Sequence, residues 1–97
     1  MTALHIAWFS FKDGVPPERI NHHLQACRDL VVVVPVVINL QCGPSYSKRS
    51  GSLTHCIVVT LPDRASLPKY LEHPAHVPVA DALVKDVAEL QVMDLEV

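Results

Sequence analysis

The chain has 97 residues, of which 49% are hydrophobic and 19% are charged, and its formal net charge is −2 at pH 7. This length corresponds to one domain, and the apolar content excludes an intrinsically disordered chain. The charge provides no basic surplus for phosphate groups, and no apolar run approaches the roughly 20 residues of a membrane span, so binding to nucleic acid or to membranes is not expected.

The first two thirds of the chain predict three strands and one long helix. Residues 4–11 alternate between two sets of side chains, which indicates a strand covered on both faces. Pro16 and Pro17 favour a helix start. The apolar spacing continues to near Val32, where β-branched valines and Pro35 end the helix. The elements that follow are a strand over 36–42, a polar loop over 44–52 and a strand over 54–61.

The last third of the chain predicts two short helices and a strand. Asp63 is a candidate N-cap of the first helix, which carries Tyr70. Pro68 and Pro78 are expected to shorten or kink the two helices, because proline lacks a backbone N–H and crowds the preceding turn. The elements that follow the first helix are a second helix over 73–85 and a final strand over 87–95.

The order of these elements predicts an α+β fold, the ferredoxin-like split βαβ sandwich, in a single domain over residues 1–97. The helices cover one face of the sheet. The other face is also apolar, and the chain holds no further element to cover it. We therefore expect a homodimer in which two sheets pack face to face. The side chains expected on this open face are Leu4, Ile6, Trp8, Cys56 and Val58.

Several motifs along the chain carry a family resemblance. His5 lies in the first strand, which Phe11-Lys12-Asp13 ends, and Thr54-His55 opens the third strand. The segment Tyr70–His76 has the sequence YLEHPAH, and Met93–Glu96 lies in the last strand. Together these motifs resemble the stress-responsive A/B barrel (Dabb) domain family. The resemblance covers nearly the whole chain and implies a dimeric α+β barrel.

One enzymatic branch of this family comprises the olivetolic acid cyclase-like polyketide cyclases, which close a linear polyketide by aldol condensation. The resemblance implies a catalytic pair at Tyr70 and His76, with supporting histidines at His5 and His55. Where those cyclases carry aromatic residues on the first helix, this chain has His23 and Cys27, so these two are further candidates for contact with a substrate. The implied reaction is a lyase-type closure of a carbonyl or polyketide-like compound that uses no cofactor.

The histidines themselves support acid–base chemistry. His5 and His55 share the phase of the inward apolar residues, and His76 follows Tyr70 within two helical turns. We expect these side chains to meet in one hollow between sheet and helices. A neutral imidazole at His76 can take a proton from the carbon next to a carbonyl, and the Tyr70 hydroxyl can stabilise the resulting oxyanion.

Other interpretations remain open from the sequence. His73 precedes a proline and is expected to be structural. The whole motif can serve a non-catalytic stress-responsive or ligand-binding dimer, and the wider α+β barrel group offers cofactor-free monooxygenases by analogy. His-x-x-His spacing with two further histidines allows a zinc site, but no acidic residue joins the histidines in sequence, so no metal is expected.

The cysteines indicate a reducing compartment. Cys27, Cys42 and Cys56 are odd in number, widely spaced and without a CxxC pair, which is typical of free thiols. Residues 1–11 carry no basic cluster before their apolar stretch, so they do not resemble a secretion signal. We therefore expect a cytoplasmic protein.

Overall fold

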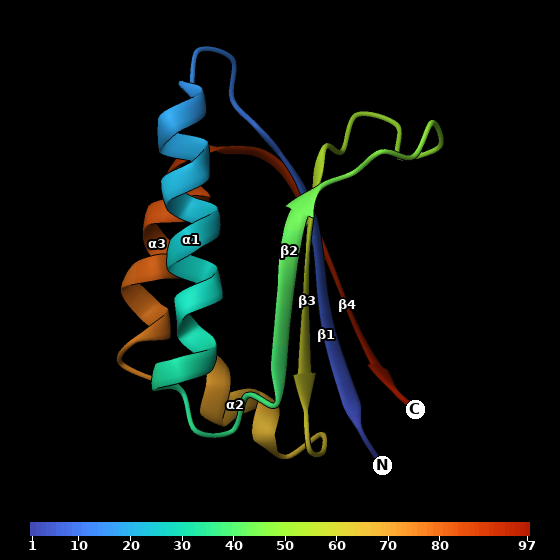
Figure 1. The fold of residues 1–97 in the computed structure, drawn as a ribbon. Coiled ribbons are helices and arrows are strands. Elements are labelled where there is room, and N and C mark those ends of the chain that lie inside the picture. The colour runs from blue at the N-terminus through green and yellow to red at the C-terminus, as the bar shows by residue number, and fades with distance from the viewer.

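The computed structural model describes residues 1–97 and places them in two layers, an antiparallel sheet and helices on one of its faces (Figure 1). The strand order is β2-β3-β1-β4, with all neighbours antiparallel. This topology is the ferredoxin-like α+β fold and confirms the predicted fold class. The elements are β1 (Ala3–Phe11), α1 (Pro17–Val33), β2 (Asn39–Pro44), β3 (His55–Leu61), α2 (Ser66–Leu71), α3 (His76–Asp86) and β4 (Val87–Glu96).

The strand β2 begins later than the sequence pattern predicts. Pairing with β3 starts at Ile38, whose N–H donates to the Thr60 carbonyl at 2.9 Å. The preceding valines serve the core, since Val34 is fully buried and Val37 is 7% exposed. A turn closed by the Val37 N–H and the Val34 carbonyl directs both side chains inward. These valines therefore pack against the end of α1 and do not extend the strand.

The two helical prolines lie near the starts of helices that begin later than the sequence predicts, which agrees with the expected shortening. Pro68 and Pro78 are each the third residue of their helix. The first turn of a helix has no partner for its backbone N–H groups, so a proline there removes no hydrogen bond. The helix α3 starts at His76 because residues 73–75 form a turn, in which the His76 N–H donates to the His73 carbonyl.

The core lies between α1 and the sheet. Phe9 on β1 and Val59 and Leu61 on β3 are fully buried. The apolar stripe of α1 packs against them, because its buried residues recur every three or four positions along the helix. These buried α1 residues are His23, Leu24, Cys27 and Leu30.

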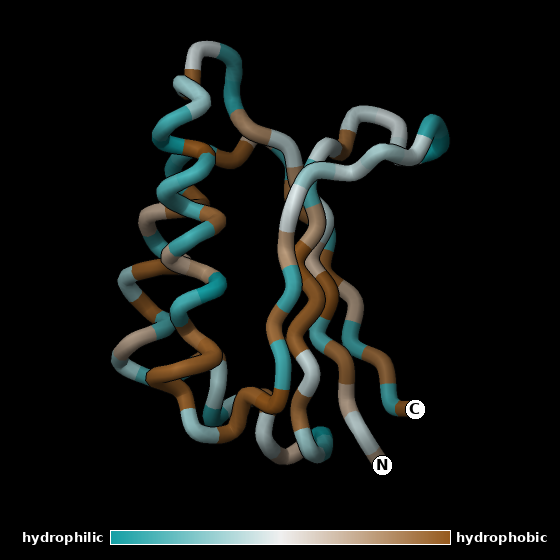
Figure 2. Tube along the Cα trace, viewed as in Figure 1, coloured by the Kyte–Doolittle hydropathy of each residue, from teal (hydrophilic) through white to brown (hydrophobic).

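The face of the sheet away from the helices is uncovered, as Figure 1 shows. Apolar side chains pair across it, with Ile6 of β1 opposite Val58 of β3 and Met93 of β4. The loop 45–54 projects beyond this face and carries few apolar residues (Figure 2). None of the three helices combines the length and apolar character that a bilayer-crossing helix requires.

Candidate functional site

The register of β1 divides the predicted histidine site into two groups. His5 pairs with Val59 and Asp94, whereas His55 pairs with Phe9. Four residues of β1 separate the two histidines along the sheet, which is about 13 Å at ~3.3 Å per residue. The expectation that His5 and His55 meet in one hollow is therefore wrong. The strands are adjacent as predicted, but their pairing places these side chains at different heights.

One group, which we call the Tyr70 cluster, consists of His5, Tyr70, His76 and Asp94. The ring centroids of Tyr70 and His76 are 4.5 Å apart, and those of Tyr70 and His5 are 5.9 Å apart. The four residues come from β1, α2, α3 and β4. The fold therefore brings together His5, Tyr70 and His76 from the predicted set, with the phenol between two imidazoles.

The protonation state of His76 follows from its hydrogen bond. Its Nδ1 lies 2.9 Å from the Leu71 carbonyl oxygen, which can only accept, so Nδ1 carries the proton. Neutral His76 therefore has its lone pair on Nε2. Burial and the neighbouring His5 lower the pKa of His76, against the opposing effect of the Leu71 carbonyl. The imidazole is thus mainly neutral at pH 7 and available as a base.

Tyr70 is suited to donate a hydrogen bond. Its side chain is only 4% exposed, and burial raises its pKa well above the ordinary value, with the Cys27 and Cys42 thiols adding to the effect. The phenol therefore keeps its proton at neutral pH. No side-chain oxygen or nitrogen in the chain is both buried and unpartnered. Since the Tyr70 hydroxyl makes no hydrogen bond within the chain, it reaches solvent.

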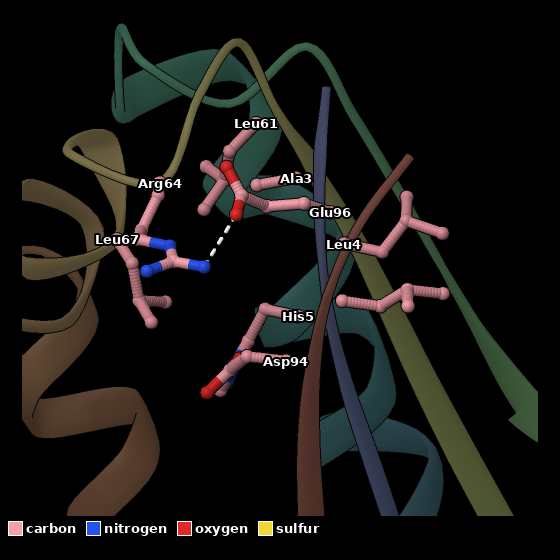
Figure 3. Close-up of a pocket in the computed structure, with 9 residues that line it drawn as sticks. Ala3, Leu4, His5, Leu61, Arg64, Leu67, Asp94 and Glu96 are labelled. Atoms are coloured by element: carbon pink, nitrogen blue, oxygen red, sulfur yellow. Dashed lines mark hydrogen bonds and ion pairs between the residues drawn. The ribbon is translucent and has the colours of Figure 1, made fainter. Parts of the chain in front are cut away.

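A cavity of about 280 Å³ adjoins the Tyr70 cluster at His5 and Asp94 (Figure 3). The His5 Nδ1–H donates to the Asp94 carboxylate over 2.6 Å, so the ring orientation is fixed. Arg64 and Glu96 form an ion pair at the opposite rim. Tyr70 and His76 do not line this cavity. The remaining walls are mainly apolar and include Ala3, Leu61, Leu67 and Leu95.

Sequence reasoning missed the three charged residues of this cavity. Asp94 and Glu96 alternate with apolar residues in an exposed edge strand, a pattern typical of solvated side chains. The available signal was their phase. Antiparallel partners point to the same face, and β4 pairs Asp94 with His5 and Glu96 with Ala3. Arg64 lies in the turn after β3, where the sequence shows nothing but polarity.

The second group, which we call the Phe11 cluster, consists of Phe9, Phe11, His23, His55 and Asp86. His23 stacks on Phe11 at 6.0 Å, and His55 meets Phe11 edge to face at 5.1 Å. The His23 Nε2–H donates to the Asp86 carboxylate at 2.7 Å, which also accepts two hydrogen bonds from Arg19. These two partners lower the pKa of Asp86. His23 and His55 therefore lie away from the Tyr70 cluster.

The remaining predicted residues occupy supporting positions. His73 accepts a hydrogen bond from the Ala75 N–H at 3.0 Å and so stabilises the turn before α3. Cys27 is 4% exposed in the core, and burial raises its pKa to about 12. No three histidine, cysteine, aspartate or glutamate side chains group together in a way that would hold a metal ion.

Solved structures of other proteins share this fold. A hydroxynitrile lyase from Passiflora edulis superposes with a TM-score of 0.92 at 15% identity, over 99% of this chain and 93% of that one. A dimeric ferredoxin-like protein of unknown function from Thermobifida fusca superposes with a TM-score of 0.87 at 22% identity, over 100% and 92% of the two chains. At these identities the likeness establishes the fold, and it includes one enzyme and one dimer.

Sequence comparison identifies the family. The stress-response A/B barrel domain-containing protein HS1 of Arabidopsis thaliana is 28% identical over 92 residues, which are 93% of this chain and 84% of that protein. The family model for the stress responsive A/B barrel domain matches residues 3–97. The resemblance drawn from the motifs is thereby confirmed, and the chain belongs to the stress-responsive A/B barrel (Dabb) domain family.

Proposed function

We propose that the Tyr70 cluster performs cofactor-independent acid–base chemistry on a small carbonyl compound. The observation that carries this proposal is the position of the Tyr70 phenol between His76 and His5. Of these two imidazoles, His76 is neutral with a lone pair on Nε2, and His5 is oriented by Asp94. A base, a hydrogen-bond donor and an oriented second imidazole are the groups that proton abstraction next to a carbonyl requires.

The reaction begins with a proton transfer. His76 Nε2 takes a proton from the carbon next to the carbonyl, and the C–H electrons move into the enolate. The negative charge gathers on the carbonyl oxygen, where the Tyr70 hydroxyl donates a hydrogen bond. His5 binds or orients the same oxygen. The enolate carbon then attacks a second carbonyl in an aldol closure, and the alkoxide that forms there takes the proton from His76. In an isomerisation, the enolate instead takes this proton back on a different carbon. Either route returns His76 to its neutral form.

Polyketide aldol cyclisation is the most specific form of this proposal. The cavity of about 280 Å³ is at the lower end of the range for small-molecule sites, which starts near 300 Å³. Its size favours a short chain over a long one. The same fold serves an enzyme in another protein, since the structural neighbour from Passiflora edulis is a hydroxynitrile lyase.

The test is hydrogen–deuterium exchange at the carbons next to the carbonyl of small ketones and aldehydes, followed by NMR in D2O. We expect the wild-type protein to accelerate exchange beyond the rate of free imidazole. His76→Ala should lower the rate by about 100-fold or more, and Tyr70→Phe should lower it with the fold intact by circular dichroism. Wild-type exchange no faster than free imidazole, or exchange unchanged in His76→Ala, would contradict the proposal.

A non-catalytic ligand-binding role is the second candidate. It is favoured by one observation, namely that His5 and Asp94 line the cavity while Tyr70 and His76 do not. Under this alternative, added ketones shift the NMR signals of cavity residues, but the ketone protons next to the carbonyl do not exchange with deuterium. The same titration therefore separates the two candidates.

We also propose that a second copy of the chain covers the open face of the sheet. The face pairs Ile6 with Val58 and Met93, and the structural neighbour from Thermobifida fusca is dimeric. A hollow of about 880 Å³ between this face and the projecting loop is bordered by Trp8, Met93 and Tyr46. Within one chain the Tyr46 side chain is fully exposed, so a second copy could cover it.

Sedimentation tests the dimer. The wild-type chain should sediment with the mass of two chains at micromolar concentration. Ile6→Glu, which places a charge in the middle of the open face, should give one-chain mass. Val32→Glu is the matched control, because Val32 is 83% exposed on α1, away from that face. A wild-type monomer at micromolar concentration would overturn this proposal.

The compartment remains a proposal as well. All three cysteines are free, and free thiols persist in reducing compartments such as the cytoplasm. Oxidation of the purified protein in air, followed by intact-mass measurement under denaturing conditions, shows whether any of them pairs readily.

A further inference from the structure

The cavity beside His5 has an ionic rim that the acid–base chemistry does not use. Arg64 approaches from the turn before α2, and Glu96 approaches from the end of β4 (Figure 3). The two side chains form an ion pair on one side of the hollow, while His5 and Asp94 lie on the other. Apolar walls separate the two pairs.

The backbone at Arg64 is well anchored although the side chain is largely exposed. Asp63 Oδ1 accepts hydrogen bonds from the Ser66 N–H at 2.9 Å and the Ser66 hydroxyl at 2.7 Å. These bonds close the turn that contains Arg64, and they lower the pKa of Asp63. The Arg64 side chain itself is 80% exposed, and its partner in the chain is Glu96, which is 34% exposed.

We propose that Arg64 binds the carboxylate of a small oxo acid in this cavity, and that Glu96 is the resident carboxylate which the ligand displaces. The guanidinium group presents a planar fork of N–H donors that matches a carboxylate. An exposed ion pair contributes only about 0–1 kcal/mol, so exchanging one carboxylate for another costs little. Displaced Glu96 can turn to water, because it is already partly exposed.

Charge at the cavity supports an anionic ligand at this end only. Arg64 is the one permanently cationic side chain that lines it. The Asp94 carboxylate is bound through Oδ1 by His5 on the other side of the cavity, away from the guanidinium. A carboxylate held at Arg64 directs the rest of a short molecule along the apolar wall toward His5. This inference rests on the proposed function for its choice of a carbonyl compound and adds an acidic end group to it.

The experiment compares 2-oxobutanoate with 2-oxobutanamide, which have nearly the same shape and differ in charge. Dissociation constants are measured by NMR titration of the isotope-labelled protein. We expect the acid to bind the wild-type protein at least about tenfold more tightly than the amide. Arg64→Gln should abolish this preference, and Arg64→Lys should retain part of it. Glu96→Gln should strengthen binding of the acid several-fold, since the internal competitor is gone.

Arg49→Gln is the matched control, because it removes an exposed arginine from the projecting loop and should leave the preference unchanged. Equal binding of acid and amide, a preference that survives Arg64→Gln, or no detectable binding of the acid would each overturn the inference. Weaker binding of the acid in Glu96→Gln would also do so, since Glu96 would then be a support and not a competitor.

Failure of this inference is distinguishable from failure of the proposed function. The titration needs no turnover. A charge preference that depends on Arg64 without any proton exchange leaves the inference standing and removes the catalytic proposal. Proton exchange that depends on His76, without any preference for the acid over the amide, leaves the catalytic proposal standing and removes this inference.

Discussion

The Tyr70 cluster and the Phe11 cluster lie on the same helix-facing side of the sheet and are built from the same kinds of residue. Each contains two imidazoles, an aromatic ring between them and an aspartate. In the Phe11 cluster, the His23 Nε2–H is held by Asp86, and both imidazoles lie against Phe11. In the Tyr70 cluster, His76 keeps a free Nε2, and a cavity opens beside His5.

The difference teaches which feature marks a reactive histidine. Burial lowers the pKa of His55 as well as that of His76, so a lowered pKa does not separate the clusters. The central ring does separate them, because a phenol can donate a hydrogen bond to a substrate and a phenyl ring cannot. In the Tyr70 cluster a ring nitrogen without a partner lies beside an available phenol, and a cavity adjoins this cluster at His5 and Asp94.

The largest difference between the clusters is expected when the half-buried histidine of each is replaced by alanine. His76→Ala should reduce proton exchange by about 100-fold or more, whereas His55→Ala should leave it within about threefold of the wild-type rate. Both variants remove an imidazole whose pKa is lowered by burial, so the pair is matched. Rates are compared by NMR in D2O. An equal loss in both variants would show that the clusters act as one unit.

For stability, the larger effect is expected in the Phe11 cluster. His23→Ala removes a buried ring, its stack on Phe11 and its hydrogen bond to Asp86. We expect the free energy of unfolding to fall by about 2 kcal/mol. Urea denaturation measures this loss. His22→Ala is the control, since His22 is exposed on the same helix, and it should change stability little. A His23→Ala protein as stable as the wild type would mean that the Phe11 cluster does not hold α1 to the sheet.

Most of the fold was predictable because it depends on local patterns. The alternation in β1 correctly predicts the inward set that includes His5 and Phe9, and the helical spacing predicts the buried stripe of α1. The exact start of the helix that holds Pro68 was less predictable, because the cost of a proline depends on its place within the helix. That place was set by the preceding turn, which the sequence does not reveal.

The candidate site was less predictable because it depends on register. His5 and His55 have the correct phase, but only the pairing of β1 with β3 shows that they lie at different heights. Asp94 joins His5 through the pairing of β1 with β4. Arg64 reaches the cavity from the turn between β3 and α2. Such contacts arise between segments far apart in the chain, and no periodicity within one segment encodes them.

The two clusters should also respond to acid at different pH values. The folded pKa of His76 lies below 6.5, so activity that needs the neutral base is full above that pH and falls as pH drops through the folded value, by about tenfold per unit. The folded pKa of Asp86 lies below 3.8, so its stabilising effect is present above pH 3.8 and is lost as pH falls through the folded value. Between these ranges the protein should be folded and inactive.

A pH series of exchange rates and of urea midpoints measures both responses. Burial lowers the pKa values of both His55 and His76, so protonating either ring costs stability, and a shallow decline of the midpoints is expected as pH falls from 6.5 through the two folded values. Asp86→Asn should flatten the steeper decline below pH 4 and leave the activity profile unchanged. Activity and stability that fall together would show that acid inactivation is simply unfolding.

The smallest effect is expected at Cys27, which lies close enough to Tyr70 for its thiol to affect the pKa of the phenol. Cys27 is 4% exposed and has a pKa of about 12, so its reactive thiolate is scarce at pH 8. Alkylation of the native protein should therefore spare Cys27 and label the partly exposed Cys42, while urea should allow all three cysteines to react. Mass spectrometry of peptides distinguishes the sites. Cys27→Ala should cost about 1 kcal/mol of stability and lower exchange by less than about threefold, because the thiol is buried in the hydrophobic core. Rapid labelling of Cys27 in the native protein would mean that α1 opens from the sheet. The packing of α1 would then not hold Tyr70 in a fixed position.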